Sequence, residues 1–225
     1  MAASGQQFAA ANCWPEAAIC YSEMEISGLE NVVVRHKDVV GSPIERTLTH
    51  IERQETSMFR GLIRGSALAL TSGLQTTEFE SFGSFHKLMA QLALAGEFRL
   101  VDGPTYYKRL HGSNLHLKWY GWSEERRRAA WALLAAQFLE VIVPAGRSAQ
   151  ERWHLCLTVL DRFIVAREGR WMFCLVDNGD TQGRAALLRA VFAFTQSQSE
   201  LDLPAVLEAP WWELEKRAAQ KFGVL

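Results

Sequence analysis

A short basic and aromatic segment, GPTYYKRLHGSNLHLKW, occupies residues 103–119. Its residue types suit an anionic ligand, because Arg109 could bind a phosphate through two parallel hydrogen bonds and Lys108 could hold one as a point charge. His111 could donate to the same group or bind a metal ion through a ring nitrogen, and Gly112 would permit close backbone approach. A solvated strand end would have the same composition, with the lysine in water and the arginine paired with a surface carboxylate.

An acidic cluster, TTEFESF, lies at residues 76–82 and contains Glu78 and Glu80. Either carboxylate could act as a general base if a cleft raised its pKa. The cluster also precedes a predicted helix, where the helix dipole favours negative charge without any catalytic role. Both interpretations are open on the residues alone.

The familiar short motifs of nucleotide and metal sites are absent. The sequence has no G-x-x-x-x-G-K-[ST] loop, no G-x-G-x-x-G, no H-E-x-x-H and no G-x-S-x-G. It also lacks a D-x-D pair that would bind a divalent cation through hard oxygen ligands. Asp177 and Asp180, in DNGD, are instead predicted to lie in a turn.

The composition is that of a folded protein without general affinity for nucleic acid. The chain has 225 residues, 48% of them apolar, and a formal net charge of −1, so it can bury a core but lacks the basic excess of nucleic-acid-binding domains. None of its cysteines forms a C-x-x-C pair, and Cys20 and Cys156 lie in apolar runs typical of buried thiols. No signal peptide and no run of ~20 apolar residues is evident. These features predict a cytoplasmic protein, free or at the inner face of the membrane, with no transmembrane segment.

Strands and helices are predicted to alternate up to residue 120: strands over 17–26 and 30–40, a helix over 44–53, and a strand with a short helix over 58–73. The next helix has Ser84 as its cap and Gly96 as a left-handed stop. A strand over 97–101, a turn at 102–104 and a strand over 105–110 follow. The basic segment therefore begins on a strand and leaves it at His111.

Beyond residue 120 the pattern is mainly helical. One helix is predicted after Ser123, which acts as its cap, and a second follows the capping box formed by Ser148 and Glu151. Two more are predicted near 182–196 and 211–222, whereas 171–176 fits either a strand or a buried helix. The boundary near residue 120 divides the chain into an α/β part and a helical part.

The order of these pieces resembles the second half of the catalytic domain of bacterial family 2 glycosyltransferases. The pieces are AAICYSEMEI, FRGLIRGSAL and FESFGSFHKLMAQLALAGEFRLVDGPTYYKRLHGSN, within residues 16–120. In that family the domain half begins with a strand, which is followed by an "fRgLiRr" strand and helix. Next come a helix that carries an acidic pair and ends in Ala-Gly, and then a "YyyRlHgsN" segment. The resemblance implies an α/β fold with a partial, Rossmann-like mixed sheet of nucleotide-sugar-transferase type over residues 1–120, and a helical extension over 121–225.

The resemblance also implies a function, the transfer of a sugar from a nucleotide-sugar donor to a glycan or other hydroxyl acceptor in cell-surface polysaccharide biosynthesis. Such enzymes usually use Mg or Mn to bridge the pyrophosphate of the donor. The basic segment would then lie beside the departing diphosphate, with His111 also near the metal and Asn114 ordering the loop. The implied substrate-binding residues are Tyr107, Lys108, Arg109, His111 and Asn114.

Two departures from the family pattern bear on activity. The acidic pair of the family falls here on Ser84 and Phe85, so Glu80, one turn earlier, is the substitute for the catalytic base. The first half of the family domain, with its D-x-D motif, would precede residue 1, and a partner chain could supply that donor-binding half. The strand over 17–26 would then lie at an exposed edge of the sheet.

Two other functions fit the same residues. One is a non-catalytic glycosyltransferase-like remnant that binds a glycan or a partner protein. Its candidate interface is a set of tryptophans in the helical part: Trp131, Trp153, Trp171, Trp211 and Trp212. The other is an RNA-binding module in which Tyr106 and Tyr107 stack on bases, although the near-neutral charge argues against nucleic acid as a partner.

Overall fold

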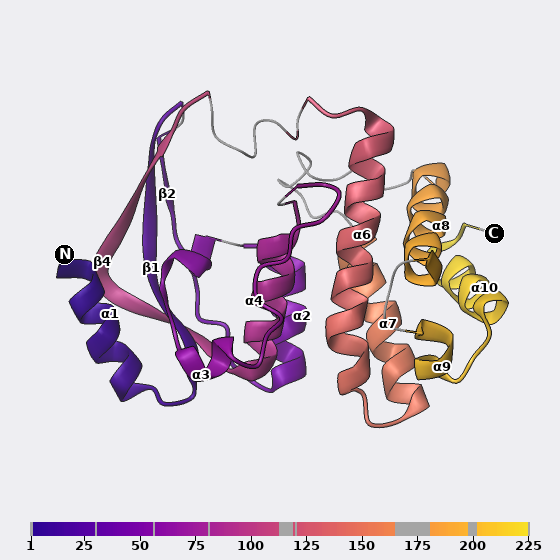
Figure 1. The fold of residues 1–225 in the computed structure, drawn as a ribbon, viewed down its shortest axis with the longest axis horizontal. Coiled ribbons are helices and arrows are strands. Elements are labelled where there is room, and N and C mark those ends of the chain that lie inside the picture. Colours follow the sequence, from indigo (N-terminus) through magenta and orange to yellow (C-terminus); the bar gives the residue numbers. More distant parts are fainter. Residues whose placement is uncertain are drawn as a thin grey trace. The chain divides into compact units, whose positions relative to one another are not determined.

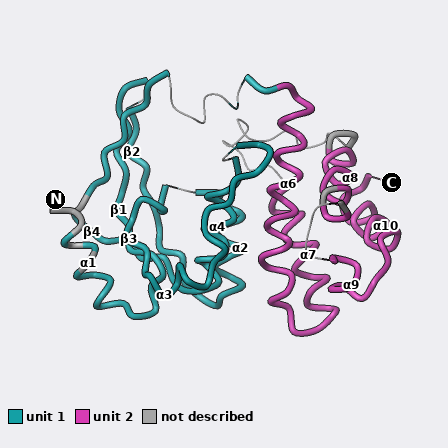
Figure 2. Tube along the Cα trace, viewed as in Figure 1, with its two compact units in different colours: residues 1–122 teal, residues 123–225 magenta. Residues whose placement is uncertain are grey.

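The computed structural model describes residues 2–29, 31–55, 57–80, 82–112, 119, 121–164, 181–197 and 202–224. The chain forms two compact units, residues 1–122 and 123–225, which Figure 2 distinguishes by colour. The first unit is a mixed α/β structure and the second is helical in its described residues, so the predicted mixed α/β class is confirmed.

The sheet of the first unit is built around β1 (Ala17–Gly28). This strand pairs with β4 (Glu97–Leu110) in parallel and with β2 (Val32–Val34) and β3 (Leu62–Ile63) in antiparallel orientation. The expectation that the first strand lies at an exposed edge is therefore wrong. Its neighbours come from later parts of the same chain, which place it at the centre of the four-stranded sheet.

The predicted turn at residues 102–104 is also wrong, because β4 continues through it as one strand. The pairing with β1 passes from Tyr21↔Leu100 to Glu23↔Thr105. This step advances two residues on β1 and five on β4, so β4 carries three extra residues. Figure 1 shows the bend that results. Turn residues such as Gly103, with φ +96°, also suit a bulge, which bends a strand without reversing it.

Helices cover both faces of this sheet (Figure 1). On one side, α1 (Ala2–Cys13) packs against Cys20 and Val101. On the other side, the core contains residues of β1, β4 and α4 (Ser84–Ala95), among them Ile19, Phe98 and Leu92. The alternation of Ile19 and Cys20 between the two cores follows from the period of two along a strand.

The described residues of the first unit also form α2 (Pro43–Arg53), the 3-10 turn η1 (Ser57–Arg60) and α3 (Gly65–Leu68). The helix predicted over 44–53 is confirmed as α2. Its start is a capping box, in which Glu45 N donates to Ser42 Oγ and Ser42 N donates to Glu45 Oε2.

The ends of α4 differ from the prediction. Its cap residue is Gly83, and the Ser84 hydroxyl instead donates to the Gln75 carbonyl. Gly96 is extended, with φ −172°, and is not a left-handed stop. A glycine is needed there for space, because a Cβ atom would lie 2.6 Å from the Glu16 carbonyl oxygen.

In the second unit the structure describes the helices α6 (Glu124–Ile142), α7 (Ala149–Ile164), α8 (Thr181–Ser197), α9 (Leu203–Leu207) and α10 (Trp211–Phe222), with a 3-10 turn η2 (Val143–Ala145). The four helices predicted here are confirmed, whereas α9 was not predicted. Trp131 packs on Phe163 in the core, and Trp212 is 65% exposed. Trp171, the 171–176 segment and the Asp177–Asp180 turn lie outside the described residues.

One described helical stretch, Glu124–Ala145, has the length and composition to cross a membrane. However, 61% of its apolar window is buried inside the structure. The central helix of a protein core meets the same criterion, so this stretch is weak evidence for a membrane span.

The described cysteines allow a test of the core. Cys20 and Cys156 are buried and Cys13 is exposed. Burial raises the pKa of the Cys20 thiol. It raises the pKa of the Cys156 thiol to about 12. We expect iodoacetamide to alkylate Cys13 at least ~100-fold faster than Cys156, because the thiolate is the reactive form. Peptide mass mapping over time measures both rates, and urea should abolish the difference. Equal rates in the folded protein would contradict the buried position of Cys156.

Candidate functional site

The basic segment leaves the sheet at the carboxyl ends of two parallel strands. Arg109 pairs with Ser27 and Leu110 pairs with Gly28, the last residues of β4 and β1. In open α/β sheets, ligands bind outside the carboxyl ends of the strands. His111 follows directly and is exposed, so an anion at this edge could contact it.

The predicted binding residues of this segment do not share one face. Successive side chains of a strand point to opposite faces, so Tyr107 and Arg109 lie on one face and Lys108 on the other. Tyr107 is 72% exposed, and Arg109 is also exposed, whereas Lys108 is partly buried. The structure therefore groups Tyr107, Arg109 and the strand end at His111. Asn114 lies outside the described residues.

The strand end is held by a close backbone approach. Gly28 has φ +107°, and a Cβ atom on it would collide with the Leu110 carbonyl oxygen. The same oxygen accepts a hydrogen bond of 3.3 Å from Leu29 N. Because these atoms are adjacent to Arg109 and His111, the fit of Gly28 sets the point at which the basic segment leaves the sheet.

Glu80 lies on the loop between α3 and α4. It has a left-handed backbone, with φ +58°, which is uncommon for a residue other than glycine. The Glu80 carbonyl oxygen accepts a hydrogen bond of 3.1 Å from Thr77 N, and Glu80 is exposed. Figure 1 shows this loop beside α4 and away from the tip of the β1–β4 ribbon.

The loop of Glu80 carries an aromatic cluster, formed by Phe79, Phe82, Trp119 and Trp122. Phe82 packs edge-on against Trp119 with ring centroids 5.0 Å apart, and Phe79 and Trp122 are separated by 6.2 Å. Trp119 is the last residue of the basic segment. The segment therefore starts at the sheet and ends against the Glu80 loop, which connects the two parts of the candidate site along the chain.

Sequence analysis missed a cation beside this segment. The Arg60 guanidinium lies 4.6 Å from the ring centroid of Phe59 and 5.4 Å from that of Tyr106. Phe59 in turn stacks on Phe85, with centroids 4.1 Å apart. Phe85, which the resemblance placed at the position of an acidic pair, therefore serves packing here. The only sequence signal for Arg60 was its place in the "fRgLiRr" piece.

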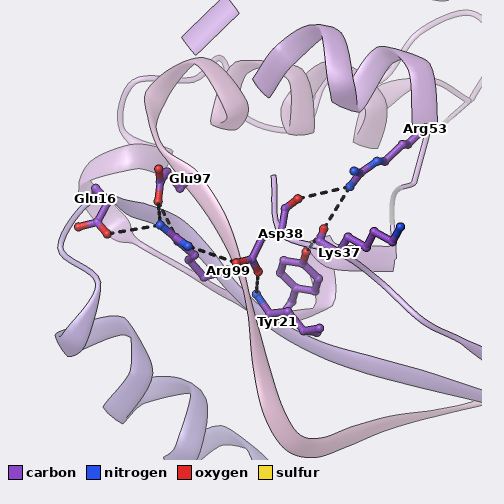
Figure 3. A network of polar contacts seen from close by, with 8 residues as sticks. Glu16, Tyr21, Lys37, Asp38, Arg53, Glu97 and Arg99 are labelled. Atoms are coloured by element: carbon purple, nitrogen blue, oxygen red, sulfur yellow. Dashed lines mark hydrogen bonds and ion pairs between the residues drawn. The ribbon is translucent and has the colours of Figure 1, made fainter. Parts of the chain in front are cut away.

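A second charged group, around Arg99, is structural (Figure 3). Arg99 Nε donates to Glu97 Oε2 at 2.8 Å, and its Nη1 donates to Asp38 Oδ2 at 3.2 Å. Asp38 also accepts from Leu100 N at 2.7 Å. These bonds attach residues 38–39 to β4, where Val39 forms an antiparallel bridge with Phe98.

Tyr21 supports the same attachment. Burial raises the pKa of its hydroxyl, and the nearby charges of Asp38 and Glu55 raise it further. The hydroxyl therefore remains protonated and donates to the Lys37 carbonyl oxygen at 2.8 Å (Figure 3).

The described residues do not fit a resident divalent cation. Within them, no group of three or more His, Cys, Asp or Glu side chains could hold a metal ion. His111 belongs to no such group among the described residues.

Comparison with known proteins was made for the whole chain. No protein-family model, no curated protein and no solved structure matches it.

Proposed function

We propose that residues 1–122 are the acceptor-side half of a glycosyltransferase-type module that binds the diphosphate of a nucleotide-sugar at the end of β4. The observation that carries the proposal is the position of Arg109 and His111 at the carboxyl ends of the parallel strands β1 and β4. That edge is where phosphate-containing ligands bind in open α/β sheets. Arg109 is exposed there and can form the two parallel hydrogen bonds that a phosphate accepts.

The proposed reaction is a displacement at the anomeric carbon of the donor sugar. The acceptor hydroxyl forms the new C–O bond, and the bond between the sugar and the diphosphate breaks. Arg109 stabilises the charge that develops on the diphosphate. A carboxylate takes the hydroxyl proton. Glu80 is the candidate that the resemblance implies, and it lies on a loop away from the strand end that carries Arg109. In the aromatic cluster, Phe79 and Phe82 are buried, whereas Trp119 and Trp122 are partly exposed and could stack on the apolar face of a sugar ring.

The proposal includes three further features implied by the family resemblance. The donor-binding half would come from a partner chain or from sequence outside residues 1–225. A Mg or Mn ion would be held by that half and by the diphosphate, since the described residues do not hold one. The module would act in the cytoplasm, on a glycan or other hydroxyl acceptor.

A non-catalytic glycan-binding module is the second candidate. It is favoured by the positions equivalent to the family's acidic pair, where the Ser84 hydroxyl bonds to Gln75 and the Phe85 ring stacks on Phe59. Such a module would bind a sugar at the aromatic cluster without turnover. Release of free nucleotide diphosphate from a nucleotide-sugar in the presence of an acceptor glycan would contradict this second candidate.

Nucleotide binding tests the first candidate. We expect UDP or GDP to raise the midpoint of thermal unfolding, because a ligand that binds only the folded state stabilises it. Arg109→Ala should weaken the affinity at least ~10-fold, which is the loss of one charge-assisted hydrogen bond. The shift should persist in EDTA, because the described residues form no cation cluster.

Two matched variants make the result specific. Lys108→Ala removes a cation from the opposite face of the same strand and should reduce the affinity less than Arg109→Ala. Arg128→Ala removes an arginine whose partner is Glu124 in the second unit, and should leave the shift unchanged. The proposal fails if no nucleoside diphosphate shifts the midpoint of thermal unfolding. It also fails if Arg109→Ala, Lys108→Ala and Arg128→Ala change the nucleotide affinity equally.

A further inference from the structure

A serine, a histidine and a glutamate form a hydrogen-bonded chain in the first unit. The Ser57 Oγ atom lies 3.0 Å from His36 Nε2, and the His36 Nδ1 atom lies 3.4 Å from Glu55 Oε2. The His36 side chain is 1% exposed and that of Glu55 is 27% exposed, while Ser57 is partly exposed. A buried imidazole therefore connects a partly exposed hydroxyl to a carboxylate.

The carboxylate fixes the direction of the protons in this chain. An ionised carboxylate can only accept hydrogen bonds, so His36 Nδ1 must donate to Glu55. In a neutral imidazole the other nitrogen, Nε2, then carries the lone pair. The Ser57 hydroxyl must therefore donate its proton toward Nε2. This is the tautomer in which an imidazole can remove the proton of a serine nucleophile.

Packed neighbours hold the three side chains in place. The His36 ring lies edge-on to Tyr21, with ring centroids 5.7 Å apart and planes at 74°. Met58, next to Ser57, is 1% exposed and anchors η1 in the core. Glu55 follows Gln54, the left-handed residue that ends α2. These contacts favour a maintained geometry, which a nucleophile and its base require.

We propose that Ser57, His36 and Glu55 form an acyl-transfer site that accepts carboxylic esters. Ser57 Oγ forms a bond to the ester carbonyl carbon while its proton passes to His36 Nε2. The bond between that carbon and the alcohol oxygen then breaks, and the imidazolium gives its proton to the departing alcohol. Water repeats the same proton path on the acyl-serine and releases a carboxylic acid and free Ser57. Glu55 is a positioning residue that holds the imidazole tautomer.

This site is independent of the proposed sugar transfer, because it uses none of the residues at the end of β4 or on the Glu80 loop. It also has no sequence motif, since the helix α2 separates His36 from Glu55 and Ser57 along the chain. Nucleophile–base–carboxylate sets are identified by geometry and not by position in the sequence.

A fluorophosphonate probe tests the proposal on the full chain. The Ser57 oxygen should displace fluoride from the probe and become phosphonylated, which peptide mass spectrometry locates. Ser57→Ala should abolish this label. Ser72→Ala is the matched control, because Ser72 bonds to Gln91 at 3.1 Å, and it should leave labelling unchanged. p-Nitrophenyl acetate should be hydrolysed by the wild type and not by Ser57→Ala.

Glu55→Gln distinguishes a positioning role from a structural one. The glutamine amide can donate to His36 Nδ1, which moves the ring proton to Nε2 and removes the acceptor of the Ser57 proton. We expect labelling at least ~100-fold slower, with no recovery between pH 6 and pH 9, and an unchanged circular dichroism spectrum. No label at Ser57 in the folded wild type would overturn the proposal. Labelling of Glu55→Gln at the wild-type rate would overturn it equally.

Discussion

Replacing Arg46 with alanine is expected to lower the free energy of unfolding of the first unit by about 3–5 kcal/mol. Arg46 is 7% exposed. Its guanidinium donates to the carbonyl oxygens of Ala93 at 2.8 Å, Gly41 at 2.6 Å and Leu94 at 3.2 Å. Ala93 and Leu94 belong to the last turn of α4, whose carbonyl groups have no partner within the helix. Alanine would leave these acceptors buried, and would also remove a cation that the helix dipole favours at this end.

Urea unfolding measures this loss as a lower midpoint with an unchanged slope. Hydrogen exchange shows which element loses stability, because the backbone amides of α4 should exchange faster in Arg46→Ala than in the wild type. Arg53→Ala is the matched control on the same helix, because Arg53 is less buried and donates to Lys37 O at 3.2 Å from an exposed position. Arg53→Ala should lower the free energy of unfolding by less than about 1 kcal/mol. A loss of similar size in both variants would show that the Arg46 contacts contribute nothing specific.

Replacing Gly28 with alanine is expected to separate the ends of β1 and β4. The left-handed φ of +107° costs an alanine about 1–3 kcal/mol, and its Cβ atom would in addition meet the Leu110 carbonyl oxygen. The backbone at Leu110 cannot yield as a flexible side chain would. We therefore expect faster amide exchange over residues 105–111 and, if the proposed function holds, at least a ~10-fold loss of affinity for a nucleoside diphosphate.

Gly112→Ala is the matched control for Gly28→Ala. No atom lies within 4 Å of a Cβ built on Gly112, although this glycine is only two residues beyond Leu110. Its backbone is outside the left-handed region, so alanine should change neither stability nor amide exchange. Unchanged exchange at residues 105–111 in Gly28→Ala would contradict the role given to the Gly28 contact, whatever the outcome for nucleotide binding.

Much of the secondary structure could be predicted because it depends on local signals. The capping box at Ser42 and the caps at Ser148 and Ser123 each satisfy free backbone groups within four residues along the chain. The residues that determine where a helix starts therefore lie within a few positions of that start. The helices that follow these residues were predicted close to their observed bounds.

Features that depend on distant backbone could not be predicted in the same way. Gly96 was interpreted as a left-handed stop, whereas its small size serves the approach of the Glu16 carbonyl, 80 positions earlier in the chain. The Asp-Gly-Pro sequence fits a turn as well as a bulge, and only pairing with β1 decides between them. α1 was missed because it lacks an apolar face with helical period and is held by contact with the sheet.

The same difference between local and distant contacts applies to the candidate site. Tyr107, Lys108, Arg109 and His111 could be grouped from sequence because they are consecutive, but which of them share a face required the strand. The chain from Ser57 through His36 to Glu55 brings together residues up to 21 positions apart. Nothing in their spacing indicates contact, because the helix α2 lies between His36 and the other two residues.

The three extra residues in β4 also govern how this protein can change in length. Because three is odd, Tyr107 and Arg109 emerge on the face occupied by Phe98 and Leu100, and not on the face of Arg99. Losing or gaining a single residue within 101–104 would invert every side chain up to the strand end and carry Arg109 to the opposite face. A change of two residues would preserve the face. Length variation that keeps the chemistry of this edge should therefore occur in steps of two.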